Sequence, residues 1–318
     1  QACLDLDMIW LRASLLATLT LATSFSPPPS ALPTLKQGKR ACIACSKLAG
    51  EDLVRKLHRP QRRQSDSVLM LEKVVKDHRG SAEFCLGVLG DLHLDESDME
   101  MHNEGRDHMA EKLRSSNNAH LVSLGDLGAY GEAGTSKQFA FSKQYLDSYK
   151  VPFDIVTGNH DLEGMSEFET DEENLEAWLQ AFEKRDRMFC TEIARKTLCV
   201  GLSTVRFRSA QWSSHEVYVD SAQIDWFERV LEAHPAEEGW NVLVFTHAPI
   251  MGCNLRALND VHIKNGCAWI NHTDEKTRSK FIELCYKHRC IRAWFSGHFH
   301  LSHDYKEAIA TGGSGQAF

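Results

Sequence analysis

Long apolar runs are missing from this 318-residue chain: no stretch reaches the roughly 18 residues that a membrane-spanning helix requires. The sequence therefore predicts no transmembrane segment. Clustered positive charge is missing from the larger part of the chain. Residues 81–318 hold 23 Lys and Arg against 37 Asp and Glu, a net charge of −14, whereas residues 1–80 carry +6. This acidic body has no basic footprint for a nucleic-acid backbone, although bound metal ions would let it hold an anion locally.

Cysteine patterns typical of a disulfide scaffold or a thiolate zinc site are missing too. The ten cysteines are scattered along the chain. Cys42 and Cys45 form one CxxC pair, but no second pair or nearby His completes a zinc site. Any metal chemistry must therefore come from other donors.

Residues 1–63 are interpreted as a leader and disordered segment, with Met8 as the true start. The run LLATLTLA at 15–22 is typical of a signal peptide, and 25–50 is basic, rich in Ser and Pro, and free of acidic residues. The two parts resemble the leader that directs algal proteins to secondary plastids, so we expect a plastid location. A plain secretory signal followed by a linker is the alternative.

Residues 64–80 are expected to form an entry helix, because Val68, Leu71, Val74 and Val75 share one helical face. From 81 onward, apolar runs alternate with amphipathic segments. We expect strands at 84–90, 120–125, 153–158, 197–204, 240–247 and 291–298, and helices at about 102–115, 135–150, 173–186, 220–233 and 274–288. This alternation predicts an α/β domain over 81–318 whose functional groups collect beyond the carboxyl ends of the strands.

Five short polar elements follow the predicted strands. They are Asp91-Leu92-His93, Gly125-Asp126, Gly158-Asn159-His160-Asp161, Thr246-His247 and Gly297-His298-Phe299-His300. Each alone is a weak signal, because buried polar groups at strand ends commonly just form hydrogen bonds. Together they offer two Asp, one Asn and four His as ligands, a donor set suited to Mn, Fe or Zn. The set is large enough for two divalent metal ions.

The ordered motifs D-x-H, G-D, G-N-H-D, H and G-H-x-H resemble the calcineurin-like metallophosphoesterase superfamily over residues 84 to about 305. The resemblance implies a two-sheet β-sandwich flanked by helices, four layers in all. It implies that Asp91, His93 and His300 hold one metal ion, that Asn159, His247 and His298 hold the other, and that Asp126 bridges them. It also implies a closing strand after TGGSGQAF, so we expect the given chain to lack C-terminal strands.

The resemblance implies phosphoester hydrolysis by a hydroxide generated between the two ions. His160 would be the general acid for the leaving group, with Asp161 orienting its imidazole. The alternative for His160 is a hydrogen-bonding role without proton transfer. A metal-bearing scaffold without activity is the competing class of function, and such members typically lack the acid or some of the ligands.

Two branches of the superfamily fit poorly. Purple acid phosphatases carry D-x-G first and a tyrosine three residues after the bridging Asp, where this chain has His93 and Ala129. Ser/Thr protein phosphatases carry G-D-x-x-D-R-G, where this chain reads GDLGAYG. The pattern is closest to the phosphodiesterase branch. Monoesters and nucleotide pyrophosphates stay open as substrates, and so does the oligomeric state.

The expected partner is a small phosphorylated substrate, with nucleotides among the candidates. Arg106 and His102 follow the first motif and are the candidate substrate contacts, since Arg can hold a phosphate with two hydrogen bonds. The alternative for both is a solvated helix face. His215 and His303 are assigned to the solvated surface.

Overall fold

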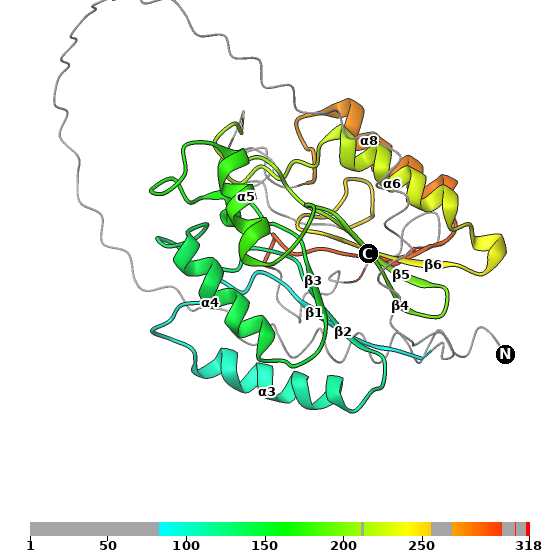
Figure 1. The fold of residues 1–318 in the computed structure, drawn as a ribbon. Coiled ribbons are helices and arrows are strands. Elements are labelled where there is room, and N and C mark those ends of the chain that lie inside the picture. Colours follow the sequence, from blue (N-terminus) through cyan, green and yellow to red (C-terminus); the bar gives the residue numbers. More distant parts are fainter. Residues whose placement is uncertain (1–82, 211–212, 256–268, 301–308, 310–315) are drawn as a thin grey trace, which may run out of the picture. The chain divides into compact units, whose positions relative to one another are not determined.

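The computed structural model describes residues 83–210, 213–255, 269–300, 309 and 316–318. The predicted leader, the CxxC pair, the entry helix and His303 lie outside the described residues. Strands and helices alternate along the chain as expected (Figure 1). The strands are β1 (Cys85–Leu89), β2 (Ala119–Ser123), β3 (Phe153–Ile155), β4 (Phe189–Ala194), β5 (Thr197–Leu202), β6 (Asn241–Thr246) and β7 (Ile291–Phe295). The main helices are α3 (Glu100–Arg114), α4 (Ser136–Asp147), α5 (Asp171–Ala181), α6 (Ser221–Ala233) and α8 (Glu275–Lys287).

The strands form two sheets. The first is parallel with the order β1-β2-β3, and the second has the order β4-β5-β6-β7, in which only β4 runs antiparallel to its neighbour. The sequence analysis missed β4. Its first three residues are only partly buried, and Thr191 and Glu192 interrupt its apolar residues. It joins β5 through a tight turn in which Lys196 has a φ of 53°. An edge strand of this kind leaves little hydrophobic signal.

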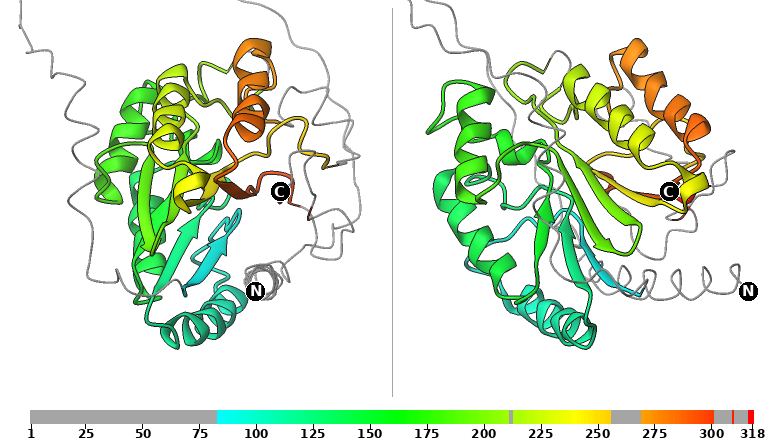
Figure 2. Two further views of the ribbon diagram at one scale, coloured as in Figure 1. Left: turned by 90° about the vertical axis from the view of Figure 1, so that its right-hand side faces the viewer. Right: turned by 45° about the vertical axis from the view of Figure 1, so that its right-hand side comes forward.

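Three apolar clusters set the order of the layers, which Figure 2 shows from two sides. One cluster lies between the first sheet and α3, α4 and α5, and another between the second sheet and α6 and α8. The third joins the inner faces of the sheets, with Leu86 and Val122 on one side and Leu243 and Phe245 on the other. The predicted two-sheet sandwich flanked by helices is therefore confirmed.

The period-two alternation of strand side chains explains how both faces are buried. In β6, Val242 and Val244 pack toward the helices, whereas Leu243 and Phe245 pack toward the other sheet. Among the described residues, no helix combines the length and apolar character that crossing a membrane requires. Near the C-terminal end, Ala317 forms a parallel bridge with Ala293 of β7.

Helix starts follow local capping chemistry. The side chain of Asp220 accepts a hydrogen bond from the backbone N–H of Gln223 at the start of α6. Thr170 and Glu173 form a reciprocal capping box at the start of α5. That helix ends earlier than predicted, because Phe182 leaves helical geometry and Glu183 has a φ of 56°.

A buried ionic cluster ties the two sheets together away from the polar motifs. The Asp154 carboxylate on β3 contacts Nε2 of His120 on β2 at 3.0 Å and Nζ of Lys184 at 3.1 Å. It also accepts a hydrogen bond of 2.6 Å from Thr191 on β4. Burial alone would raise the pKa of Asp154, but these partners outweigh it and hold the pKa well below its usual range.

Replacing Asp154 with Asn should destabilise the protein by about 3 kcal/mol near pH 7, because Lys184 loses its counterion and the buried hydrogen bonds of the carboxylate are weakened. A carboxyl with a lowered pKa contributes stability above its unfolded pKa of about 3.9 and loses it as the pH falls further. The difference between wild type and Asp154→Asn should therefore shrink below about pH 4. Chemical denaturation followed by tryptophan fluorescence measures both effects. The exposed Asp225 on α6 offers the control Asp225→Asn, and a pH-independent difference would contradict the prediction.

Candidate metal centre and phosphoester site

All five polar elements lie at carboxyl ends of parallel strands, where the two sheets meet. Asp91 and His93 follow β1, Asp126 follows β2, and the Asn159 element follows β3. From the second sheet, His247 follows β6, and His298 and His300 follow β7. Parallel strands bring these chain segments to one edge, as the sequence pattern predicted.

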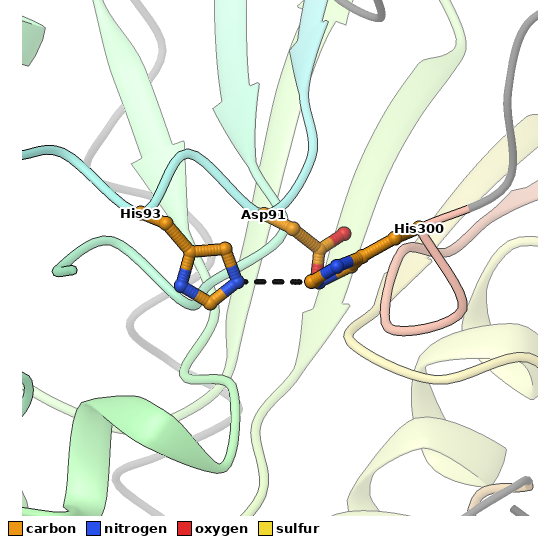
Figure 3. Close-up of side chains that lie close together, drawn as sticks. All are labelled: Asp91, His93 and His300. Carbon is orange, nitrogen blue, oxygen red and sulfur yellow. Dashed lines mark hydrogen bonds and ion pairs between the residues drawn. The ribbon is translucent and has the colours of Figure 1, made fainter. Parts of the chain in front are cut away.

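The side chains form two groups, and within each group the candidate ligand atoms lie within 4.8 Å of one another. Asp91, His93 and His300 form the first group, shown in Figure 3. Asp126, His247 and His298 form the second group. The groups adjoin, because Nε2 of His247 lies 3.1 Å from Oδ2 of Asp126 and 3.7 Å from Oδ1 of Asp91.

Imidazole nitrogens face one another in pairs. Nε2 of His93 is 3.2 Å from Nε2 of His300 (Figure 3). Nδ1 of His298 is 3.2 Å from Nε2 of His247. If one nitrogen of a pair carries a proton, it can donate a hydrogen bond to the other nitrogen. A metal cation between them can instead bind the lone pairs of both nitrogens. The paired nitrogens therefore fit metal coordination.

Backbone carbonyls orient two of these rings. Nδ1 of His247 donates to the carbonyl of Leu124 at 2.8 Å, and Nδ1 of His93 donates to the carbonyl of Gly128 at 3.2 Å. A carbonyl only accepts, so Nδ1 carries a proton and Nε2 faces the centre of the site, where it can bind a cation that displaces any proton on it. Support of this kind is characteristic of histidines that bind metals.

Asn159 supplies an independent test of fit. Its side-chain oxygen is buried and has no hydrogen-bond partner among the described residues, while its Nδ2 donates to the carbonyl of Ser214 at 3.3 Å. An orphaned buried amide oxygen is costly. A cation beside it would remove that cost, so Asn159 fits the ligand role that the sequence suggested.

Backbone strain concentrates in the same residues. Positive φ values occur at Asp91 (22°), His93 (41°), Asp126 (50°), His298 (71°) and His300 (47°). Non-glycine residues pay for this conformation, and such strain gathers at functional sites. Glycine precedes Asp91, Asp126 and His298, but no local pattern marks the positive φ of His93 and His300. The loops thus keep strained residues whose side chains the site needs.

The buried carboxylates make the site strongly negative. Burial by itself would lower the pKa of His247, but Asp126 and Asp91 outweigh it and raise the pKa to about 10. For His300, the hydrogen bond with Asp91 is the main cause of a raised pKa. The centre therefore attracts positive charge, which divalent cations would supply.

His160 has a different carboxylate partner from the one predicted. Asp161 was expected to orient it, but the Asp161 carboxylate accepts three backbone N–H groups, from Asp126, Leu127 and Gly158, at 2.8–3.0 Å. Nδ1 of His160 instead contacts the Glu163 carboxylate at 2.5 Å. The reason is local: residues 160–162 form a 3₁₀ turn, in which side chains at i and i+3 eclipse. Asp161 therefore joins the loop after β2 to the loop after β3 through hydrogen bonds.

His160 is also joined directly to the second donor group. Its backbone N–H donates to Oδ1 of Asp126 at 2.9 Å. Burial would lower the pKa of the His160 imidazole, but Glu163 and Asp126 raise it above its ordinary value. The imidazole therefore favours its protonated form.

The two predicted substrate contacts are engaged locally. Arg106 donates to Oδ1 of Asn103 at 2.7 Å and to Oδ1 of Asp107 at 2.8–2.9 Å. His102 packs edge-on against Tyr145. Both line a cavity of about 50 Å³ that reaches Asp91. Arg106 thus borders the site with its guanidinium already paired.

Two further aromatic residues surround His160. Tyr130 lies edge-on to the His160 ring with centroids 4.9 Å apart, and His215 does so at 5.5 Å. The sequence analysis placed His215 on the solvated surface and gave Tyr130 no role. His215 approaches because Ser214 holds Asn159, a contact between distant loops that no local pattern announces.

The positive φ of His93 predicts how substitutions there change the stability of the metal-free protein. In metal-free protein, His93→Gly should be more stable than His93→Ala by about 1 kcal/mol, because only Gly adopts positive φ without cost. The exposed His108 in α3 is the matched control, where Gly should instead be less stable than Ala by about 1 kcal/mol. Denaturant midpoints in a chelator measure both pairs. The same sign at both positions would contradict the strain.

Neither a protein-family model nor a curated protein sequence matches the chain. Among solved structures, it is similar to a dimetal phosphatase from Danio rerio, with a TM-score of 0.51 and 16% sequence identity. The match covers 73% of this chain and 85% of that chain. At this identity the likeness shows the fold alone: the chain has the two-sheet α/β fold of a dimetal phosphatase.

Proposed function

We propose that this chain is a metal-dependent phosphoesterase that binds two divalent ions, Mn, Fe or Zn, and acts on phosphodiesters. The carrying observation is the pair of adjoining donor groups with a positioned histidine, His160, beside them. Asp91, His93 and His300 would hold one ion, Asn159, His247 and His298 the other, and Asp126 would lie between them. Support comes from the orphaned oxygen of Asn159 and from the fold of the similar dimetal phosphatase.

When bound, the two ions would neutralise the phosphoryl oxygens and supply a nucleophilic hydroxide at neutral pH. The protein must then deliver a proton to the leaving oxygen. His160 suits this task because Glu163 occupies its Nδ1, which leaves Nε2 to face a substrate. The Asp126 carboxylate fixes the His160 backbone, so the acid is held in register with the metal ligands.

Glu163 is a positioning residue in this proposal. Its carboxylate holds the ring orientation of His160 and balances the imidazolium charge. Asp161 acts one step further back, because its three backbone hydrogen bonds hold the loops after β2 and β3 together. Arg106 and His102 are proposed only as neighbours of the phosphate. The Arg106 guanidinium would bind the phosphate only after leaving its present partners.

The full chain loaded with Mn²⁺ should hydrolyse bis(para-nitrophenyl) phosphate faster than para-nitrophenyl phosphate. His160→Ala should lower kcat at least about 100-fold, since that is the contribution of a well-placed general acid. Its bound Mn²⁺, measured by atomic absorption, should stay that of wild type. His108→Ala is the matched control and should keep full activity. A chain that binds metal and cleaves no ester with Mn, Fe or Zn would instead support a scaffold.

Glu163→Ala should lower kcat about tenfold or more with little change in KM, because it disorders the acid and spares the metal ligands. Glu163→Gln keeps an acceptor for Nδ1 and should recover part of that loss. Steady-state kinetics on the same diester measure the split, with Glu172→Ala on the exposed side of α5 as the control. A rise in KM alone would assign Glu163 to substrate binding, and no change would remove it from the mechanism.

A further inference from the structure

Tyr130 is an exposed aromatic residue beside the proposed acid. It lies in the loop after Asp126, next to Gly131, which has a φ of 101°. The Tyr130 residue is 66% exposed, although its ring is large and apolar. It belongs to none of the apolar clusters among the described residues. The folded core therefore gains little from it.

The Tyr130 ring nevertheless has defined neighbours. It stacks on His93 with centroids 5.1 Å apart and an interplanar angle of 19°. It meets His160 edge-on at 4.9 Å and 88°. The ring thus packs against a proposed metal ligand and the proposed acid, while the residue as a whole stays 66% exposed.

Its position decides which part of a substrate it would meet. A general acid must lie within hydrogen-bond reach of the leaving oxygen, about 2.6–3.2 Å. A group attached to that oxygen near His160 therefore lies close to Tyr130 as well. The phosphoryl side of the substrate would instead be held by the acidic and imidazole ligands, so the part of the substrate that is free to contact Tyr130 is the leaving group.

We propose that Tyr130 is a stacking platform that selects phosphoesters with a flat aromatic leaving group. This inference rests on the proposed function, because it assigns the leaving-group side from His160. Aromatic rings gain free energy from offset or edge-on contact beyond the burial of their surface. A saturated ring of similar size cannot make that contact equally well. The large exposed surface of Tyr130 is suited to contact with a planar ring.

The test compares phenyl and cyclohexyl leaving groups, which share six ring carbons and differ in flatness. Both are prepared as monoesters and as methyl diesters, and kcat/KM is measured for wild type and variants. Tyr130→Ala should lower kcat/KM for the phenyl ester about three- to tenfold, the size of an aromatic contact. It should change the cyclohexyl value by less than about twofold. Tyr130→Phe should keep the wild-type ratio.

Tyr286 on α8 is also an exposed tyrosine, at 53%, and Tyr286→Ala is the matched control that should leave both values unchanged. An equal loss with both esters in Tyr130→Ala would overturn the inference, because it would mean that Tyr130 only supports His93 or His160. A Tyr130→Phe variant as poor as Tyr130→Ala would overturn it too, since the hydroxyl rather than the ring would matter.

A binding measurement separates this inference from the proposed function. Phenylphosphonate and cyclohexylphosphonate are not hydrolysed, and calorimetry gives their Kd for the Mn²⁺-loaded chain. Wild type should prefer phenylphosphonate, and Tyr130→Ala should abolish most of that preference. Without turnover of any ester, a preference lost in Tyr130→Ala would sustain the platform while the proposed function fails. Turnover with no preference in either measurement would sink the platform alone.

Discussion

The buried carboxylate of Asp126 is the interaction on which the rest of the site depends. One oxygen accepts the backbone N–H of His160 at 2.9 Å, and the other lies 3.1 Å from Nε2 of His247. Asp126 follows β2 of the first sheet, whereas His247 follows β6 of the second. A single side chain therefore couples both halves of the sandwich to the candidate acid. Its strained φ of 50° is the local cost of that position.

Two levels of support hold this carboxylate in place. Asp161 accepts the backbone N–H groups of Asp126 and Leu127, which fixes the loop after β2 against the loop after β3. Further away, Asp154 joins β2, β3 and β4 through His120 and Thr191. A buried negative charge is stable only beside positive charge, and the imidazoles of the site supply part of that positive charge. The negative charge that the imidazoles do not balance makes this edge of the sandwich suited to divalent cations.

The surroundings of His160 include residues beyond the candidate metal ligands. Glu163 contacts the imidazole across a 3₁₀ turn, and the exposed Tyr130 stacks on the neighbouring His93. Neither residue has a place in the metal-binding pattern. Both residues lie in loops that follow strands, several positions after the strand ends.

The sequence alone determined the alternation of strands and helices, the sandwich class and the chemistry of the donors. This worked because apolar runs identify buried strands, and parallel strands bring the residues that follow them to one edge. The edge strand β4 was missed because Thr191 and the exposed Glu192 interrupt its apolar residues, which leaves no continuous apolar run. Only the tertiary structure decided that Glu163, not Asp161, reaches His160, and that Tyr130 and His215 surround it. Those contacts depend on turn geometry and on loops far apart in the chain, and local sequence patterns specify neither.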